Sequence, residues 1–185
     1  MTFRGFIAVD IPRSPALDGL AADLRNASPS LKVVGTDQLH LTIKFLGDTE
    51  DGLVPEIVAA IRRATSGVRP FEIQVRGTGA FPSLSRMNVI WVGIEGAGPL
   101  AKIAEALEAS LESLGFPRER RPWKAHLTLA RVKGSHDLRS VRWILESHAT
   151  DLFGTSTVDA LHLKKSELTP QGARYTIAES VRLQN

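Results

Sequence analysis

Two short segments carry the residues best suited to chemistry. They are HLTIKFLGD at residues 40–48 and HLTLARVKG at residues 126–134, and both begin with the tripeptide His-Leu-Thr. With 5 histidines, 22 leucines and 12 threonines among 185 residues, a shuffled chain would contain ~0.04 copies of this tripeptide. Two copies therefore indicate an internal repeat.

Each repeat alternates polar and apolar residues, which predicts a half-buried strand. Residues i and i+2 of a strand share a face, so His40 projects with Thr42, and His126 projects with Thr128. If the two strands line one groove, the imidazoles flank a substrate atom and the hydroxyls bind the oxygens around it. An imidazole has a pKa of about 6.5, so at neutral pH one ring can act as a general base and the other as a general acid.

A simpler interpretation applies to any single histidine. A polar strand face ordinarily leaves the side chain in water or packed against its neighbours. We interpret His136, His148 and His162 in this way, because none of them lies in the repeated tripeptide. The duplication sets His40 and His126 apart.

Positive charge gathers around the second repeat. The chain carries a formal net charge of +3, yet residues 117–134 contain six cations and one carboxylate, Glu119. The cations are Arg118, Arg120, Arg121, Lys124, Arg131 and Lys133. Such a patch suits a phosphate-rich ligand, although a basic run is also typical of a solvated surface. Its position beside the repeat favours the first interpretation.

The elements that must position these residues follow from hydrophobic periodicity. Helical spacing of apolar residues occurs in four segments, 14–27, 53–65, 98–114 and 137–147. Strand-like segments are predicted at 3–9, 38–46, 71–75, 88–94, 123–132, 153–163 and 173–183. We interpret residues 47–52 as an acidic turn and residues 77–85 as a loop.

Both repeats lie on a predicted strand that is followed by a helix, and no Gly/Ser-rich linker divides the chain. This order predicts an α+β fold with antiparallel pairs. We expect two pseudo-twofold-related lobes of antiparallel sheet, flanked by helices, around a central groove. The length suits a single bilobal catalytic domain spanning residues 1–185.

Several other chemistries are excluded by residue type. The chain has no cysteine, which removes disulfides, thiolate nucleophiles and Cys-ligated metal sites. A P-loop and the zinc motif HExxH are also absent. No apolar run approaches the ~18 residues of a spanning helix, and no export signal opens the chain. We therefore expect a cytoplasmic protein without a metal, cofactor or membrane role.

The sequence resembles the two-histidine phosphoesterases, and among them the RNA 2′,3′-cyclic phosphodiesterases, also called 2′-5′ RNA ligases. The likeness runs nearly end to end. Beyond both histidine motifs it includes RGFIAV at 4–9, KFLG at 44–47, GTGAFP at 77–82, IWVG at 90–93, SEL at 166–168 and GARY at 172–175. This sequence departs from relatives at Ala125, where proline is common, and at Met87-Asn88, where Pro-Arg is usual.

The resemblance implies metal-independent hydrolysis of an RNA 2′,3′-cyclic phosphate end to a 2′-phosphomonoester, with 2′-5′ ligation as a possible reverse activity. It implies that His40 donates a proton, His126 accepts one, and Thr42 and Thr128 bind phosphate oxygens. Arg131 is implied as a substrate ligand, although strict alternation places it on the face opposite His126. We expect a monomer acting on RNA.

Three alternatives stay open at this point. The same site could act on small cyclic nucleotides or on ADP-ribose cyclic phosphate. A module that binds RNA ends without turnover could use the basic segment and stacking aromatics, for which Phe6 and Trp123 are candidates, although each is more typical of a core. The two repeats are too similar for the sequence to decide which histidine is the acid.

Overall fold

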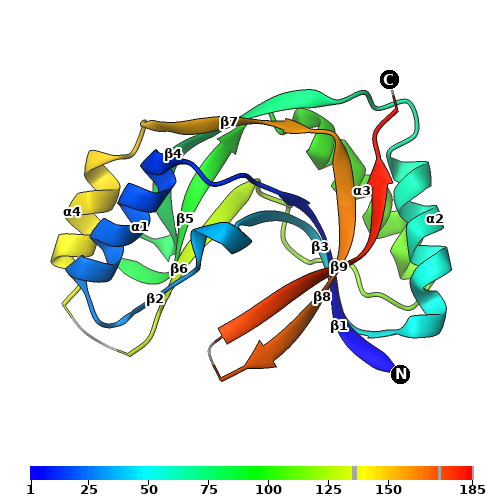
Figure 1. Ribbon diagram of the computed structural model, residues 1–185, viewed down its shortest axis with the longest axis horizontal. Coiled ribbons are helices and arrows are strands. Elements are labelled where there is room, and N and C mark those ends of the chain that lie inside the picture. The colour runs from blue at the N-terminus through cyan, green and yellow to red at the C-terminus, as the bar shows by residue number, and fades with distance from the viewer. Residues whose placement is uncertain (135–136, 171, 185) are drawn as a thin grey trace.

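The computed structural model describes residues 1–134, 137–170 and 172–184. Within them one antiparallel sheet of nine strands is packed against four α-helices (Figure 1). The helices are α1 (Pro15–Ala27), α2 (Val54–Ala64), α3 (Gly98–Glu112) and α4 (Arg139–Ser147). The strands are β1 (Thr2–Asp10), β2 (Leu31–Val33), β3 (His40–Glu50), β4 (Phe71–Ser83), β5 (Arg86–Glu95), β6 (His126–Val132), β7 (Leu152–Val158), β8 (Ala160–Thr169) and β9 (Gly172–Arg182).

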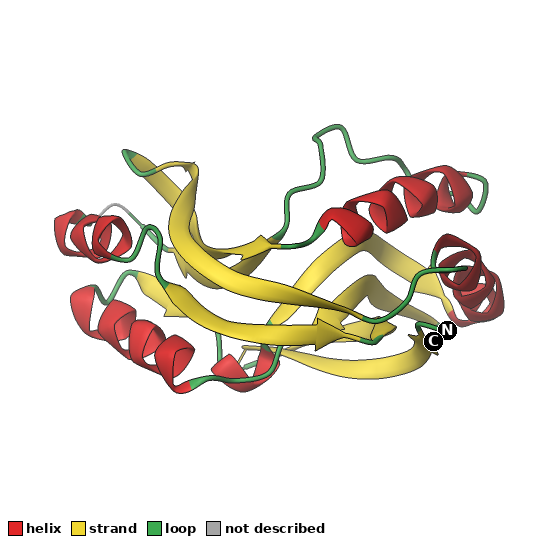
Figure 2. Ribbon diagram, turned by 90° about the horizontal axis from the view of Figure 1, so that it is seen from above, coloured by secondary structure: helices red, strands yellow, loops and turns green. Residues whose placement is uncertain are grey.

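The sheet is built from two halves with matching layouts. Its strand order is β7-β4-β5-β6-β3-β1-β8-β9, with β2 attached to β6, so four strands of this order lie on each side of the β6–β3 junction. Helices α1 and α4 pack on the half that contains β4 and β7, whereas α2 and α3 pack on the half that contains β3 and β9. Seen from above, the helices lie towards the two ends and the strands run between them (Figure 2). The predicted α+β class with two lobes is confirmed.

Local sequence explains where the helices begin and which face they bury. Ser14 caps α1 by accepting a hydrogen bond from the backbone N–H of Leu17 at 3.1 Å, and Pro15 occupies the first turn. In α3 the buried residues recur at helical spacing, namely Leu100, Ile103, Ala104, Leu107 and Leu111. All four predicted helices are confirmed, with small shifts at their ends.

Three strand predictions were too short or too long, and in two of them glycine was interpreted only as a turn former. β3 continues through the expected acidic turn to Glu50, and β4 runs through the expected loop to Ser83. Gly47 and Gly77 have φ of 72° and 70° and lie at irregularities in the β1–β3 and β4–β5 ladders. A glycine at positive φ also suits a β-bulge, which bends a strand without ending it. β6, by contrast, begins only at His126.

The predicted strand at 153–163 is wrong in a different way. It consists of two strands, β7 and β8, separated at Asp159. β7 pairs with β4 at one edge of the sheet, whereas β8 pairs with β1 and β9 in the other half. Val158 and Ala160 keep the apolar alternation across Asp159, and the prediction did not recognise the change of phase at Leu161 as a break. The short strand β2 was also missed.

Candidate active site

The register of β3 and β6 brings the two motifs together. Leu41 pairs with Leu127 in an antiparallel ladder, and both leucines are fully buried. Continuing that register places His40 opposite Thr128 and His126 opposite Thr42, on the face away from the leucines. All four polar side chains are half-buried. The predicted groups are thus neighbours in one sheet, arranged as a two-by-two array.

The array places the two histidines on a diagonal of the β3–β6 ladder. In this register His40 and His126 occupy diagonal positions, which on an antiparallel pair lie roughly 7–8 Å apart. Across the ladder, Thr128 is the residue opposite His40 and Thr42 is the residue opposite His126.

Backbone carbonyls orient both histidines in the same way. Nδ1 of His40 lies 2.9 Å from the carbonyl oxygen of Gln38, and Nδ1 of His126 lies 2.8 Å from that of Lys124. A carbonyl only accepts hydrogen bonds, so Nδ1 donates its proton in each case. In both rings Nε2 is therefore the nitrogen that remains available to exchange a proton.

The rings have different surroundings. His40 packs against Phe6 and Tyr175, with ring centroids 4.9 Å away in both contacts. His126 makes an edge contact with Phe81 at 5.0 Å. Burial lowers the pKa of His40 below its ordinary value, and nearby Lys164 lowers it further, whereas the hydrogen bond to Gln38 opposes the shift. The free protein therefore favours a neutral His40 at pH 7.

A second group of charges lies beside His40. The Lys164 ammonium donates a hydrogen bond to Asp10, the residue opposite His40 in the β1–β3 register. His162 Nε2 lies 4.0 Å from the Asp10 carboxylate, and its Nδ1 lies 2.8 Å from Ser180 Oγ. Burial lowers the pKa of His162 as well. His162 is thus a half-buried packing residue outside the array.

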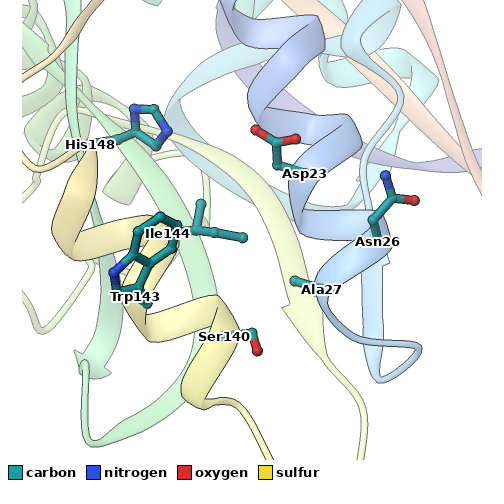
Figure 3. A pocket seen from close by; sticks show the side chains of 7 residues that line it. All are labelled: Asp23, Asn26, Ala27, Ser140, Trp143, Ile144 and His148. Carbon is teal, nitrogen blue, oxygen red and sulfur yellow. The ribbon is translucent and has the colours of Figure 1, made fainter.

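His148, at the end of α4, lies apart from the motifs. Its Nδ1 lies 2.7 Å from Asp151 Oδ2. His148 lines an open cavity of about 430 Å³ between α1 and α4, together with Asp23, Asn26, Ala27, Ser140, Trp143 and Ile144 (Figure 3). None of these residues belongs to the repeats. His136 lies outside the described residues.

A bulge in each motif strand changes which residues follow the histidine on its face. The β1–β3 register skips Ile43, and the β5–β6 register skips Leu129. Each skipped residue and its successor are both buried, so strict alternation fails there. The next residues, Phe45 and Arg131, are exposed and return to the histidine face. The alternation argument against Arg131 therefore does not hold.

Phe45 is the member of this surface that the sequence reasoning missed. Its side chain is 60% exposed, and its ring centroid lies 6.4 Å from that of Phe6. Aligning the two repeats places Phe45 at the position of Arg131, a signal that was available in the sequence. Of the two aromatics considered for stacking, Phe6 is buried at 3% exposure, and Trp123 donates its Nε1–H to the Thr42 carbonyl at 2.9 Å.

The basic segment lies at the surface before and within β6. Arg118 forms an ion pair with Glu112 at 2.9 Å. The side chains of Arg120, Arg121, Lys124 and Lys133 are exposed. Lys124 also supplies the backbone carbonyl that orients His126, so the basic segment runs directly into the array.

The described residues form neither a metal-binding cluster nor a membrane-spanning helix. Among residues 1–134, 137–170 and 172–184, no three His, Asp or Glu side chains gather in a way that could hold a metal ion. In the same part of the chain, no helix is long and apolar enough to cross a membrane.

Comparison with known proteins places these features in context. The family described as the 2′-5′ RNA ligase superfamily matches residues 11–169. A protein of Methanothermobacter thermautotrophicus named RNA 2′,3′-cyclic phosphodiesterase is 33% identical over 185 residues, covering 99% of this chain and 100% of that protein. One of the same name from Aeropyrum pernix is 36% identical over 146 residues, covering 78% of this chain and 82% of that protein.

Solved structures share the fold. The Thermus thermophilus protein TT0787 superposes with a TM-score of 0.81 at 33% identity, with 97% of each chain covered. E. coli LigT, solved in complex with 3′-AMP, superposes with a TM-score of 0.72 at 22% identity over the whole of both chains.

Proposed function

This chain belongs to the 2′-5′ RNA ligase superfamily, and from that premise we propose that it hydrolyses the 2′,3′-cyclic phosphate at an RNA end. The observation that carries the proposal is the two-by-two array of His40, Thr42, His126 and Thr128 at the β3–β6 junction. Relatives named for this activity match nearly the full chain. The site takes one motif strand from each half, so residues 1–185 act as one catalytic unit, and a monomer contains both histidines.

The reaction requires one proton to be removed and one to be supplied. His126 Nε2 takes a proton from a water molecule while the water oxygen attacks phosphorus. The bond between phosphorus and O3′ then breaks. With the phosphate bound, His40 is protonated at both ring nitrogens, and its Nε2 gives a proton to the departing O3′, which leaves a 2′-phosphomonoester. Resemblance to the family supports this choice of acid and base. The diagonal placement suits in-line displacement, because acid and base must approach opposite sides of the phosphate.

Charge develops on the non-bridging oxygens during attack, and the array offers partners for it. Thr42 and Thr128 hydroxyls donate hydrogen bonds to those oxygens, where such bonds are strongest in the transition state. Arg131 lies farther along the same face of β6 and pairs with a phosphate of the substrate. Phe45 offers an exposed ring on which a base can stack. The strained cyclic ester is already activated, so the proposed mechanism uses no metal.

The lowered pKa of His40 has a consequence for pH dependence. We expect NMR titration of the free protein to give His40 a midpoint below the ordinary ~6.5. A bound 2′-nucleotide product should raise that midpoint, because its phosphate favours the protonated ring. The pH profile of kcat/KM should be a bell whose limbs belong to the coupled pair. A His40 midpoint above ~6.5 without ligand would contradict this picture.

The same shift links His40 to stability. In the unfolded chain the ring has its ordinary pKa of ~6.5, so protonation favours unfolding once the pH falls below that value. The stability that comes from keeping His40 neutral is fully present above pH ~6.5, and it is lost as the pH falls towards the lowered pKa of the folded protein. We therefore expect the free energy of unfolding, measured with urea at several pH values, to fall as the pH is lowered below ~6.5. The fall should be less steep for His40→Gln than for the unaltered protein.

The activity is tested with a short RNA that ends in a 2′,3′-cyclic phosphate. We expect repeated turnover in the presence of a chelator, with phosphorus NMR identifying a 2′-phosphomonoester. Binding without turnover would favour an RNA-end binding module. Faster turnover of a cyclic mononucleotide or of ADP-ribose cyclic phosphate would favour a small-molecule phosphodiesterase. Incubating the cyclic-phosphate RNA with a 5′-hydroxyl RNA tests for reverse 2′-5′ ligation.

A further inference from the structure

The loop between α3 and β6 is attached to β3 at two points, and we call residues 117–125 the strap. Its first attachment involves Lys44, which is buried on the core side of β3. The Lys44 ammonium donates hydrogen bonds to the Pro117 carbonyl at 2.7 Å and to Glu108 at 2.8 Å. Glu108 also accepts the backbone N–H of Glu119 at 3.0 Å. The start of the strap is thereby held against β3 and α3.

The second attachment lies close to the array. Trp123 donates its Nε1–H to the backbone carbonyl of Thr42 at 2.9 Å, so the strap touches the first motif directly. The next residue, Lys124, supplies the carbonyl that holds His126 Nδ1 at 2.8 Å. A continuous path of contacts therefore runs from the strand that carries His40 to the ring of His126.

This path matters because the two halves share little direct pairing. Among the described residues, the β3–β6 ladder has a single Cα pair, Leu41 with Leu127, whereas β4 and β5 pair along most of their length. A short ladder constrains relative position weakly. The strap links the two motif strands a second time, through the contacts of Trp123 with Thr42 and of Lys124 with His126.

We propose that Trp123 is a positioning residue that holds the Lys124 carbonyl, and through it the His126 imidazole, at a set place relative to His40. This inference rests on the proposed function of the two histidines. Trp123 touches neither substrate nor reacting atoms. A small displacement of a catalytic group lowers the reaction rate strongly, so the loss of a single hydrogen bond in this path should lower kcat measurably.

The test is Trp123→Phe, which removes the indole N–H and keeps an aromatic ring. We expect kcat on the cyclic-phosphate RNA to fall about tenfold, while KM changes by less than about twofold. Trp143→Phe is the matched control, because Trp143 is 69% exposed on α4 and lies outside the strap. It should leave both constants unchanged.

Double variants separate positioning from a merely structural role. In a His126→Ala background, Trp123→Phe should cause no further loss, because the group that it positions is gone. In a His40→Ala background the tenfold loss should persist. Equal losses in both backgrounds, or none in the unaltered protein, would overturn the inference. Full activity of His126→Ala would instead overturn the proposed function.

A second variant guards against a fold defect. Glu108→Gln weakens the Lys44 attachment without altering Trp123 or the array. If Trp123→Phe fails to give a cooperative unfolding transition, the same double-variant comparison is made with Glu108→Gln. We expect a smaller loss of kcat that also disappears in the His126→Ala background. A loss that persists there would reject the strap as a positioning device.

Discussion

His40→Ala and His126→Ala should each reduce turnover of a cyclic-phosphate RNA at least ~10²-fold, the usual scale for a general acid or base. Each substitution removes the Nε2 that the proposed mechanism uses, so either the proton acceptor or the proton donor is lost. Both side chains are half-buried, so the loss of packing is modest. Single-turnover rates measure the chemical step, and urea unfolding shows whether the fold persists.

His162→Ala is the matched control for these variants. His162 is also half-buried, its pKa is also lowered by burial, and it lies near Asp10 in the same sheet. Because it lies outside the repeated motif, we expect its loss to leave turnover within a few-fold of the unaltered protein. A His40 or His126 variant as active as this control would exclude the two-histidine mechanism.

Thr42→Val and Thr128→Val should each lower kcat/KM, by less than the histidine substitutions. Valine keeps the β-branched shape and removes the hydroxyl that the mechanism aims at a non-bridging oxygen. We expect each variant to lose about 1–3 kcal/mol of transition-state stabilisation, which is roughly 5- to 150-fold in kcat/KM. Steady-state kinetics on the same RNA measures this loss.

Thr176→Val provides the comparison for the threonine variants, since Thr176 is exposed on β9. It should leave kcat/KM unchanged. If Thr42→Val or Thr128→Val abolished turnover as completely as the histidine variants, the threonine would hold more than a phosphate oxygen. Such a result would indicate that the reacting centre does not lie between His40 and His126.

Local patterns in the sequence were sufficient for the motif residues and most of the fold class. The tripeptide repeat identified His40 and His126, and strand periodicity placed each histidine with its threonine on one face. Helix prediction succeeded because the Ser14 cap and the helical spacing of apolar residues act within a few residues. These features depend on backbone geometry over one or two turns, so the sequence reveals them directly.

Only the tertiary structure decided how the two motifs meet. Pairing of Leu41 with Leu127 joins residues far apart in the chain, and packing of the whole core selects that register. The bulges at Ile43 and Leu129 then return Phe45 and Arg131 to the histidine face.

The same distinction explains the break at Asp159 and the contact of Trp123 with Thr42. Apolar alternation runs across Asp159 from Val158 to Ala160, although β7 and β8 join different halves of the sheet. Trp123 appears in the sequence as an apolar residue of a strand, and its hydrogen bond depends on where the strap crosses β3. The sequence by itself determined which groups carry the proposed chemistry. Their spacing was decided by non-local pairing, because a strand's own pattern holds no information on its partner's register.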